Sequence, residues 1–224
     1  MPASDPGPNA VSTPYDPPLG PIPIVHEDAD LLVVDKPAGL LSVPGRGEHL
    51  ADCLLARLQA LRPEVLLCHR LDRDTSGIMV FALTKEGQRR MGRLFETKRV
   101  KKRYVALVHG AVAEAEGTID LPLIVDWPNR PLQRVDHAIG KAAVTDWTRD
   151  AVEGDATRMI LRPRTGRSHQ LRVHMRELGH PIVGDPFYSE GAEAHPRMFL
   201  HAEGLKFVHP ITERTMRLEV PAPF

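Results

Sequence analysis

The chain has few cysteines and no long apolar run. Its 224 residues include only Cys53 and Cys68, too few and too widely spaced for a disulfide framework or a zinc site. No apolar run approaches the ~20 residues that a membrane span requires. The N-terminus also lacks the charged head and apolar core of a secretory signal. We therefore expect a cytoplasmic protein with no part in a membrane.

The chain also lacks an excess of charge of either sign. Its 29 Lys+Arg balance 29 Asp+Glu, which taken alone argues against a nucleic-acid-binding protein. The distribution of charge argues the other way. Nine basic and two acidic residues lie between Lys85 and Arg103, and six arginines without any acid lie between Thr157 and Arg176. Such local basic surface is typical of a polyanion site, although two solvated helix faces would give the same pattern.

The organisation along the chain predicts a tail followed by one α+β domain. Residues 1–23 contain eight prolines and few large apolar groups, so we expect a disordered tail, with the domain at residues 24–224. Strands outnumber helices and are mostly sequential, which favours a mixed, largely antiparallel sheet flanked by helices. The expected helices span residues 50–61, 85–100 and 168–178, the last with Ser168 as its N-cap and Gly179 as its stop. The expected strands span residues 31–34, 65–67, 77–83 and 104–108, with several more between residues 118 and 161 and two near Phe199 and Met216.

The densest group of reactive side chains is His69-Arg70-Leu71-Asp72-Arg73-Asp74-Thr75-Ser76-Gly77, which lies between two apolar strands. A polar loop at the rim of a sheet is where a scaffold presents reactive groups. A turn whose aspartates cap amides and pair with arginines would have the same composition. A kinase loop is excluded, because neither D-F-G nor G-x-G-x-x-G occurs. A metal site is not expected either, since no further ligands accompany the two aspartates and H-E-x-x-H is absent.

A second group, Arg164-Thr165-Gly166-Arg167-Ser168-His169-Gln170-Leu171-Arg172, opens a predicted helix. A helix N-terminus combined with guanidinium groups makes a natural anion site, and Arg172 could reach a carboxylate held in a cleft. A third group, the basic run Lys101-Lys102-Arg103, leads into a strand with Tyr104. Such an aromatic residue could stack on a base, although a buried core tyrosine is the commoner outcome.

Taken together, these segments resemble the RluA-type pseudouridine synthases. H-R-L-D-x-x-T-S-G corresponds to the catalytic motif of that family, K-x-Y-x-A recurs at residues 102–106, and R-T-G-R-x-H-Q-L-R-V-H-M recurs at residues 164–175. The segments at residues 35–45 and 179–185 are also similar, so the resemblance covers roughly residue 24 to the C-terminus. It implies the two-lobed pseudouridine synthase fold around a cleft. Many relatives carry an S4 RNA-binding domain ahead of the catalytic domain, and we expect none here because residues 1–23 leave no room for it.

The resemblance also implies an enzyme that isomerises uridines of RNA without a cofactor or metal. Asp72 would be the catalytic carboxylate, Arg172 its partner, and Tyr104 the residue that stacks on the uracil and assists removal of the C5 proton. Arg70 would fill the space left by a flipped base. Asp72 could attack the sugar or the ring, or stabilise the cleaved glycosyl species. The residues expected to bind the substrate are Arg70, Thr75, Arg167, His169, Gln170 and Leu171.

The segment at residues 120–131, which contains Trp127 and Arg130, resembles a family member that modifies the tRNA anticodon loop and a similar loop of 23S rRNA. We therefore expect a monomer whose partner is tRNA, 23S rRNA or both. Three alternatives remain: a synthase for a different rRNA site, a non-catalytic RNA-binding module, and a hydrolase that uses Asp72 with Asp74. The intact set of Asp72, Tyr104 and Arg172 argues against the binding module.

Overall fold

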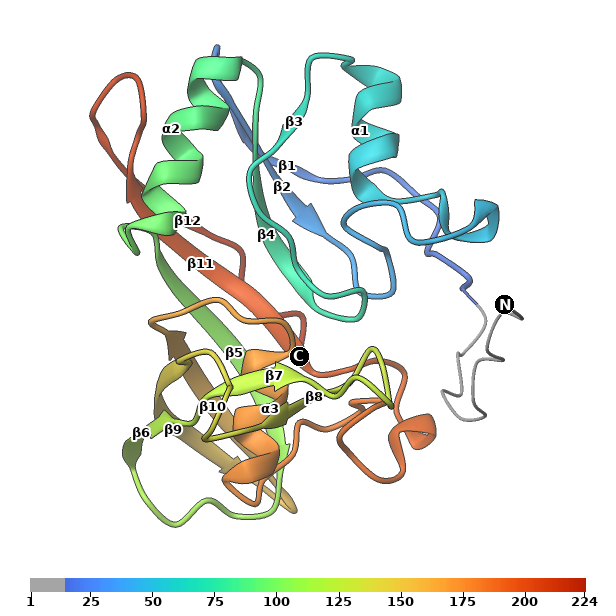
Figure 1. The fold of residues 1–224 in the computed structure, drawn as a ribbon, viewed down its shortest axis with the longest axis vertical. Coiled ribbons are helices and arrows are strands. Elements are labelled where there is room, and N and C mark those ends of the chain that lie inside the picture. The colour runs from blue at the N-terminus through green and yellow to red at the C-terminus, as the bar shows by residue number, and fades with distance from the viewer. Residues whose placement is uncertain (1–14) are drawn as a thin grey trace.

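A computed structural model describes residues 15–224 of the chain (Figure 1). Strands predominate over helices, as the sequence predicts. The helices are α1 (Leu54–Leu61), α2 (Lys85–Glu96) and α3 (Gln170–Glu177), with short 3-10 turns at Glu48–Leu50 and Ala192–Ala194. The strands are β1 (Ile24–Glu27), β2 (Leu31–Lys36), β3 (Leu66–Leu67), β4 (Ser76–Ala82), β5 (Lys101–His109), β6 (Glu116–Asp120), β7 (Leu123–Val125), β8 (Gln133–Val135), β9 (Val144–Glu153), β10 (Ala156–Pro163), β11 (Leu200–Val208) and β12 (Thr215–Glu219).

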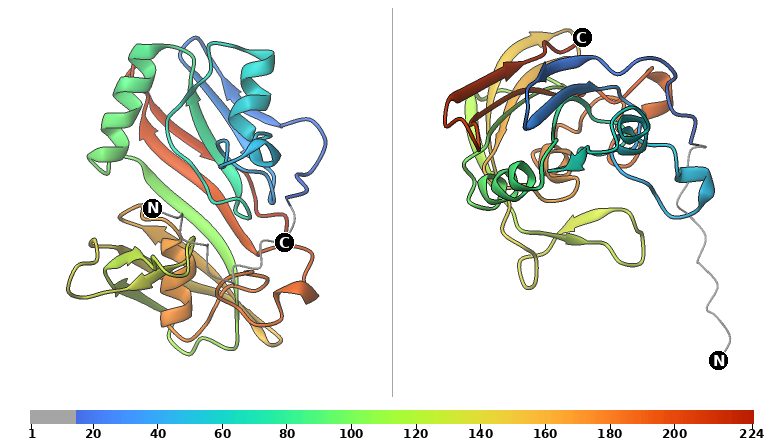
Figure 2. Two further views of the ribbon diagram at one scale, coloured as in Figure 1. Left: turned by 45° about the vertical axis from the view of Figure 1, so that its right-hand side comes forward. Right: turned by 90° about the horizontal axis from the view of Figure 1, so that it is seen from above.

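One mixed sheet runs through the described part of the molecule in the order β1-β2-β4-β11-β5-β10-β9-β6, with β12 paired to β11 and β3 to β4. Among residues 15–224 only β11 and β4 pair in parallel. A separate hairpin, β7–β8, projects beside α3 (Figures 1 and 2). The predicted α+β class with a largely antiparallel mixed sheet is confirmed. Because the sheet is continuous, the division into two lobes stays a prediction.

The central strands are apolar on both faces, which explains their continuous hydrophobic runs. In β2, Leu31 and Val33 pack with Met91 of α2 on one face, while Leu32 and Val34 pack with Leu54 of α1 on the other. A separate cluster around β5, β10 and α3 fills the other half of the molecule. The catalytic-motif loop, residues 69–75, connects β3 to β4 within this framework.

Three predicted helix boundaries are wrong. Helix α1 begins at Leu54, with Cys53 as its N-cap, rather than at residue 50. Helix α2 ends at Glu96 rather than near residue 100, and Lys98 follows with a φ of 58°, a left-handed conformation that stops a helix. Helix α3 begins at Gln170, and its N-cap is His169 with a φ of 52°, not Ser168. The predicted stop at Gly179 agrees with the structure, where this glycine has a φ of 89° directly after the C-cap.

The predicted tail is described only from residue 15 onward, and residues 1–14 lie outside the described residues. Residues 15–23 contain no helix or strand, yet they touch the rest of the chain. The Tyr15 hydroxyl donates to the carbonyl of Asp52 and accepts from the amide of Leu41, and Arg57 donates to the carbonyl of Pro18. This segment is therefore held against the 3-10 turn and α1 rather than detached from them. Within the described range, no helix is long and apolar enough to cross a membrane.

Candidate active site

The residues that the sequence analysis selected meet in one pocket of about 500 Å³. It lies where the loop before β4 faces β5 and the start of α3. Asp72, Tyr104 and Arg172 all line it, although they come from three separated segments. The six residues expected to bind the substrate line it as well: Arg70, Thr75, Arg167, His169, Gln170 and Leu171.

The loop that carries Asp72 is closed by a turn and fixed by a glycine. The amide of Thr75 donates to the carbonyl of Asp72 at 3.2 Å. Gly77 follows with a φ of 112°, and a Cβ there would lie 2.3 Å from the carbonyl oxygen of Ala202. Only glycine allows β4 to approach β11 this closely. The Asp72 side chain keeps 29% of its surface exposed, so it faces the pocket while its backbone is anchored.

Arg172 is a deeply buried cation beside Asp72. Its side chain is 2% exposed, and its Nη1 lies 3.4 Å from Oδ2 of Asp72. Its stronger partner is Asp185, whose two oxygens accept from Nε and Nη2 at 2.7 Å each. Burial alone would lower the pKa of Arg172, but hydrogen bonds and charge from Asp185 more than offset that effect, so the net pKa is raised. Arg172 therefore stays charged and aimed at the pocket.

Asp185 was not among the site residues predicted from the sequence, although it closes one of the similar segments. It is fully buried, and its Oδ1 also accepts from the amides of Phe187 and Tyr188. Gly184 precedes it with a φ of 72°, and a Cβ there would lie 2.1 Å from the carbonyl oxygen of Arg197. An aspartate with this many partners is a fixed bidentate support, and Asp72 supplies a second, weaker contact to Arg172.

Lys36 is a second buried group that the sequence analysis did not select. Its ammonium donates to the carbonyls of Leu40, Pro37 and Arg73 at 2.6, 2.8 and 2.9 Å. Burial lowers its pKa to about 7, against the opposing charges of Asp74 and Asp72. Because the carbonyl of Arg73 adjoins Asp72 in the chain, Lys36 ties the catalytic-motif loop to the turn after β2.

Strand β5 contributes Tyr104 and Lys102 to the lining of the pocket. Tyr104 packs against core clusters in both halves of the molecule. Burial, followed by the charge of Asp72, raises the pKa of Tyr104, so the phenol stays protonated near neutral pH. The Lys102 ammonium donates to the carbonyl of Thr165 at 2.7 Å, and burial lowers its pKa to about 8. Lys102 thus contributes a positive charge to the pocket at neutral pH, and this charge is lost as the pH rises above about 8.

The start of α3 differs from the anion site that the sequence suggested. Oε1 of Gln170 accepts from the amide of Arg167 and the hydroxyl of Thr165, and its Nε2 donates to Val144 and Thr145. The amide of Arg167 is therefore already used within the protein. Gln170 holds the loop in shape, while the exposed guanidinium of Arg167 borders the pocket and donates to the carbonyl of Ala142.

His169 links the pocket to the β7–β8 hairpin. Its Nδ1 lies 2.8 Å from the Tyr188 hydroxyl, which also accepts from the amide of Gln133 in β8. Burial lowers the pKa of His169. At the tip of the hairpin, the Arg130 guanidinium lies 3.9 Å from the ring centre of Trp127, which is 64% exposed. The hairpin thus carries an exposed cation–aromatic pair, and it is linked to the pocket through Tyr188 and His169.

The second aspartate of the motif takes a different position. Asp74 pairs with Nε of its neighbour Arg73 at 2.9 Å and does not line the pocket. A hydrolase mechanism would need both carboxylates at the same substrate, which this arrangement does not offer. His69 is also occupied: its Nε2 accepts from the amide of Val80, and burial, then Lys102, lower its pKa to about 3. Asp72 is therefore the carboxylate of the motif that faces the pocket.

The sequence pattern of the RNA pseudouridylate synthase family matches residues 30–177, and the chain belongs to that family. Among curated proteins it is 49% identical over 214 residues to the dual-specificity RNA pseudouridine synthase RluA of Escherichia coli, covering 94% of this chain and 98% of that protein. The RluA of Haemophilus influenzae is 46% identical over the same shares. Human RNA pseudouridylate synthase domain containing 1 superposes with a TM-score of 0.75 at 31% identity, covering 97% of this chain and 87% of that one.

Membership confirms the resemblance and the enzyme class inferred from the motifs. The chain is an isomerase of the pseudouridine synthase type that acts on RNA.

Proposed function

We propose that this enzyme uses Asp72 to isomerise uridines in compact RNA loops, namely the tRNA anticodon loop and a similar hairpin of 23S rRNA. The observation that carries the proposal is the position of Asp72: a partly exposed carboxylate facing a pocket, with the buried Arg172 3.4 Å away. The relatives named dual-specificity synthases support the pair of substrates. The free thiols of Cys53 and Cys68 support a reducing, cytoplasmic location, and we propose that a monomer suffices, since the pocket is built from one chain.

The reaction needs no external reagent. The bond from N1 to C1′ breaks, the uracil turns, a bond from C5 to C1′ forms, and C5 loses a proton while N1 gains one. Asp72 acts in the first step, by bonding to the sugar or the ring or by stabilising the cleaved sugar cation. Arg172 keeps Asp72 ionised and oriented, and Asp185 holds Arg172 in turn.

Tyr104 lies beside Asp72 and supports the uracil by stacking. Its raised pKa argues that it acts as a neutral phenol, so proton removal from C5 requires a transfer to another base, such as the Asp72 carboxylate after it leaves the sugar or ring. Arg70 is exposed and reaches Ser168 across the pocket mouth at 3.5 Å. That position suits a side chain that fills the gap of a flipped nucleotide.

The substrate part of the proposal rests on the cost of extruding a base. Unstacked bases in loops cost less to flip than paired bases in helices. Trp127 and Arg130, at the exposed tip of the hairpin, are suited to contact such a loop at the mouth of the pocket.

The test combines a point change with two minimal RNAs. Hairpins with the tRNA anticodon loop and with the 23S rRNA loop are incubated with enzyme, and pseudouridine is mapped by mass spectrometry after carbodiimide labelling. We expect both to react, and Asp72→Asn to lose at least about three orders of magnitude in rate, roughly 4 kcal/mol, while RNA affinity stays close to wild type.

The Asp74→Asn enzyme is the matched control and should be far milder. If Asp72→Asn retained a tenth of the wild-type turnover, the catalytic assignment would be wrong. If neither hairpin reacted but intact ribosomal subunits did, the substrate would be an assembly-dependent rRNA site instead. Release of free uracil would indicate a hydrolase.

A further inference from the structure

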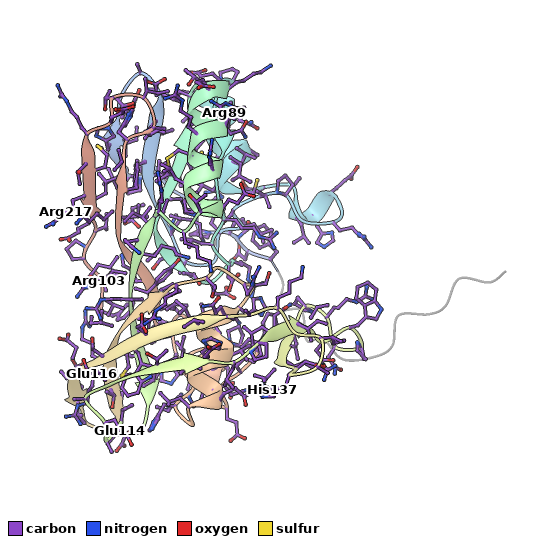
Figure 3. All side chains as sticks on the ribbon, turned by 60° about the vertical axis from the view of Figure 1, so that its left-hand side comes forward. Arg89, Arg103, Glu114, Glu116, His137 and Arg217 are labelled. Carbon is purple, nitrogen blue, oxygen red and sulfur yellow. The ribbon has the colours of Figure 1, made fainter. Side chains whose placement is uncertain are left out.

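A second hollow lies on the outer side of α2, between that helix and the loop joining β11 to β12. It encloses about 870 Å³, and four arginines line it, namely Arg89, Arg90, Arg93 and Arg99. The acidic residue in its wall is Glu213. We call this hollow the arginine groove. Figure 3 shows Arg89 on α2, well apart from Arg217 of β12. Four cations around one concave surface make a site for an anion.

The cations of the groove are not all neutralised within the protein. Arg89 and Arg90 both pair with Glu86, at 2.7 and 2.6 Å. Arg93 and Arg99, by contrast, have no carboxylate within ion-pair distance among residues 15–224, and both are exposed. Unpaired guanidinium groups that converge on one hollow favour a ligand with several negative charges.

The wall opposite α2 is preformed. Nδ1 of His209 accepts from the amides of Ile211 and Thr212 at 3.2 and 3.0 Å, which fixes the loop between β11 and β12. Arg90 donates to the carbonyl of Pro210 at 2.9 Å and so joins the loop to the helix. The groove is therefore held open by specific bonds and does not depend on the ligand for its shape.

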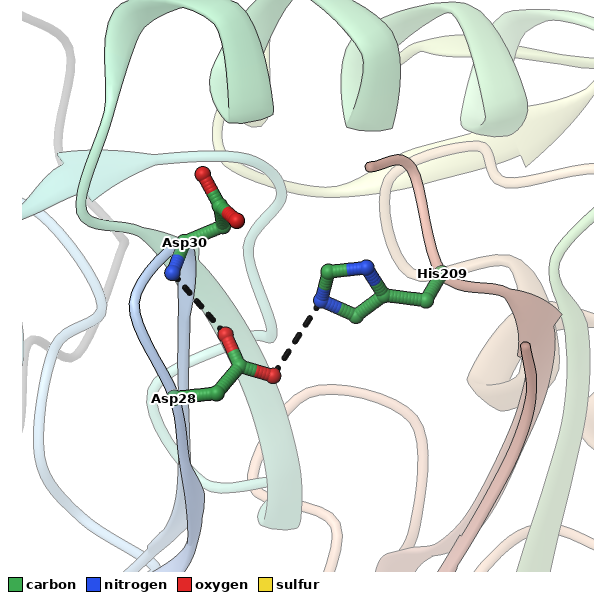
Figure 4. Close-up of side chains that lie close together, drawn as sticks. All are labelled: Asp28, Asp30 and His209. Atoms are coloured by element: carbon green, nitrogen blue, oxygen red, sulfur yellow. Dashed lines mark hydrogen bonds and ion pairs between the residues drawn. The ribbon is translucent and has the colours of Figure 1, made fainter. Parts of the chain in front are cut away.

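A metal ion at the base of this wall is a competing possibility. Asp28, Asp30 and His209 bring their ligand atoms within 4.8 Å of one another (Figure 4), and Nε2 of the buried His209 has no hydrogen-bond partner, although it lies 3.1 Å from Asp28. A histidine that binds a metal through Nε2 donates a proton from Nδ1, but Nδ1 of His209 accepts from two amides. The geometry therefore favours a hydrogen on Nε2 of His209 that points at Asp28, rather than a metal ion bound by the three side chains.

The groove adjoins the catalytic pocket at the end of α2. Leu94, Thr97 and Arg99 line the groove, whereas Phe95, Glu96 and Lys98 line the pocket. The ring of Phe95 packs on His69 of the catalytic-motif loop, with 4.6 Å between ring centres. A polyanion that leaves the pocket over residues 96–99 would enter the groove without crossing another element.

We propose that the arginine groove binds the phosphate backbone of the RNA stem beyond the loop whose uridine occupies the catalytic pocket. This inference rests on the proposed function and adds a second, separate contact to it. RNA fits better than a small anion, because the cations are spread along a helix and a turn rather than gathered at one point. Backbone binding of this kind is independent of sequence and sensitive to salt.

The test measures the dissociation constant for two hairpins that share one loop, with cytidine in place of the target uridine so that no reaction occurs. One hairpin has a minimal stem, and the other has a stem one helical turn longer. We expect wild type to prefer the long hairpin and Arg93→Gln/Arg99→Gln to lose that preference. For the long hairpin, the slope of log Kd against log salt should fall by about 1.4 to 1.8, the value for two lost phosphate contacts.

Two further variants control for a general loss of positive charge and for misfolding. Arg46→Gln/Arg217→Gln removes the same charge from two exposed residues that line neither the pocket nor the groove, and should keep the preference for the long hairpin. Glu213→Gln should strengthen binding of the long hairpin, an effect that misfolding cannot produce. Equal affinity of wild type for the two hairpins, or a preference kept by the groove variant, would overturn the inference. Failure of the proposed function would show separately, as absence of pseudouridine in the uridine-containing hairpins.

Discussion

Arg172 in the pocket and Arg93 in the groove are the same residue type with opposite surroundings. Arg172 is 2% exposed, bidentate to Asp185 and 3.4 Å from Asp72. Arg93 is exposed on α2 and has no ion-pair partner among the described residues. A buried, clamped guanidinium can orient a reacting carboxylate, whereas an exposed one attracts phosphates at long range and is screened by salt. We therefore expect burial, rather than residue type, to separate the proposed roles of the two arginines.

The sharpest test of this comparison is to remove the buried arginine. We expect Arg172→Met to lower kcat at least about a hundredfold, roughly 2.7 kcal/mol, with a smaller change in KM, because Asp72 loses its partner. Arg176→Met, one turn further along α3 and only half-buried, serves as the control. Steady-state kinetics on the anticodon hairpin decide the matter, and a normal kcat with weak binding would contradict the division of roles.

The second prediction concerns the support of that arginine. Asp185→Asn keeps the shape of the side chain but leaves Arg172 without its main counter-charge. We expect the free energy of unfolding to fall by about 3 kcal/mol and kcat to fall with it. Asp146→Asn, which breaks a more exposed pair with Arg164, should cost about 1 kcal/mol or less. Urea unfolding provides the measurement.

We expect Asp185 to act through Arg172 rather than on the substrate, and a double-mutant cycle tests this. If the kcat losses of Asp185→Asn and Arg172→Met were fully additive, the two residues would act independently. We expect the double variant to be little slower than Arg172→Met alone.

A third prediction concerns the pH dependence of RNA binding through Lys102, whose burial is intermediate between that of Arg172 and that of Arg93. Because burial lowers the pKa of Lys102 to about 8, this side chain is charged at pH 7 and mostly neutral at pH 9. RNA binding should therefore weaken over that range, with the salt slope falling by about 0.7 to 0.9 for one lost contact. Lys102→Met should remove the pH dependence, while the exposed Lys101→Met should retain it. Anisotropy titrations at several pH values would reveal a pH-independent affinity if the assignment were wrong.

The smallest expected effect concerns the paired cations of the groove. The hydrogen bonds from Arg89 and Arg90 lower the pKa of Glu86 to about 2, so this acid is ionised at all working pH values. Glu86→Gln removes the acid that both arginines pair with, while Arg90 stays bonded to the carbonyl of Pro210, so the salt slope should steepen by less than about 0.7, the value for one full contact. The melting temperature should drop slightly, because Glu86 also lies in the favourable first turn of α2. Unchanged or weaker RNA binding would count against the groove.

Much of the fold could be predicted because it depends on local patterns. The apolar run of β4 and the amphipathic pattern of α2 placed these elements to within a few residues. Two of the boundaries that were wrong, the end of α2 and the start of α3, involve non-glycine residues in left-handed conformations, Lys98 and His169. Non-glycine residues seldom adopt such a backbone, so the sequence gives little local signal for it.

The sequence by itself determined the family and the candidate residues: the motifs selected Asp72, Tyr104 and Arg172, and the order of the motifs indicated the family. Only the tertiary structure decided what each neighbour does. Gln170 uses its amide to hold a loop, Asp74 turns away to Arg73, and Asp185 clamps Arg172 from 13 residues away. The arginine groove likewise requires α2 and a loop more than 100 residues later to meet. The physical reason is that hydrogen bonds, desolvation and ion pairing depend on distances in space, which the spacing of residues along a chain does not specify.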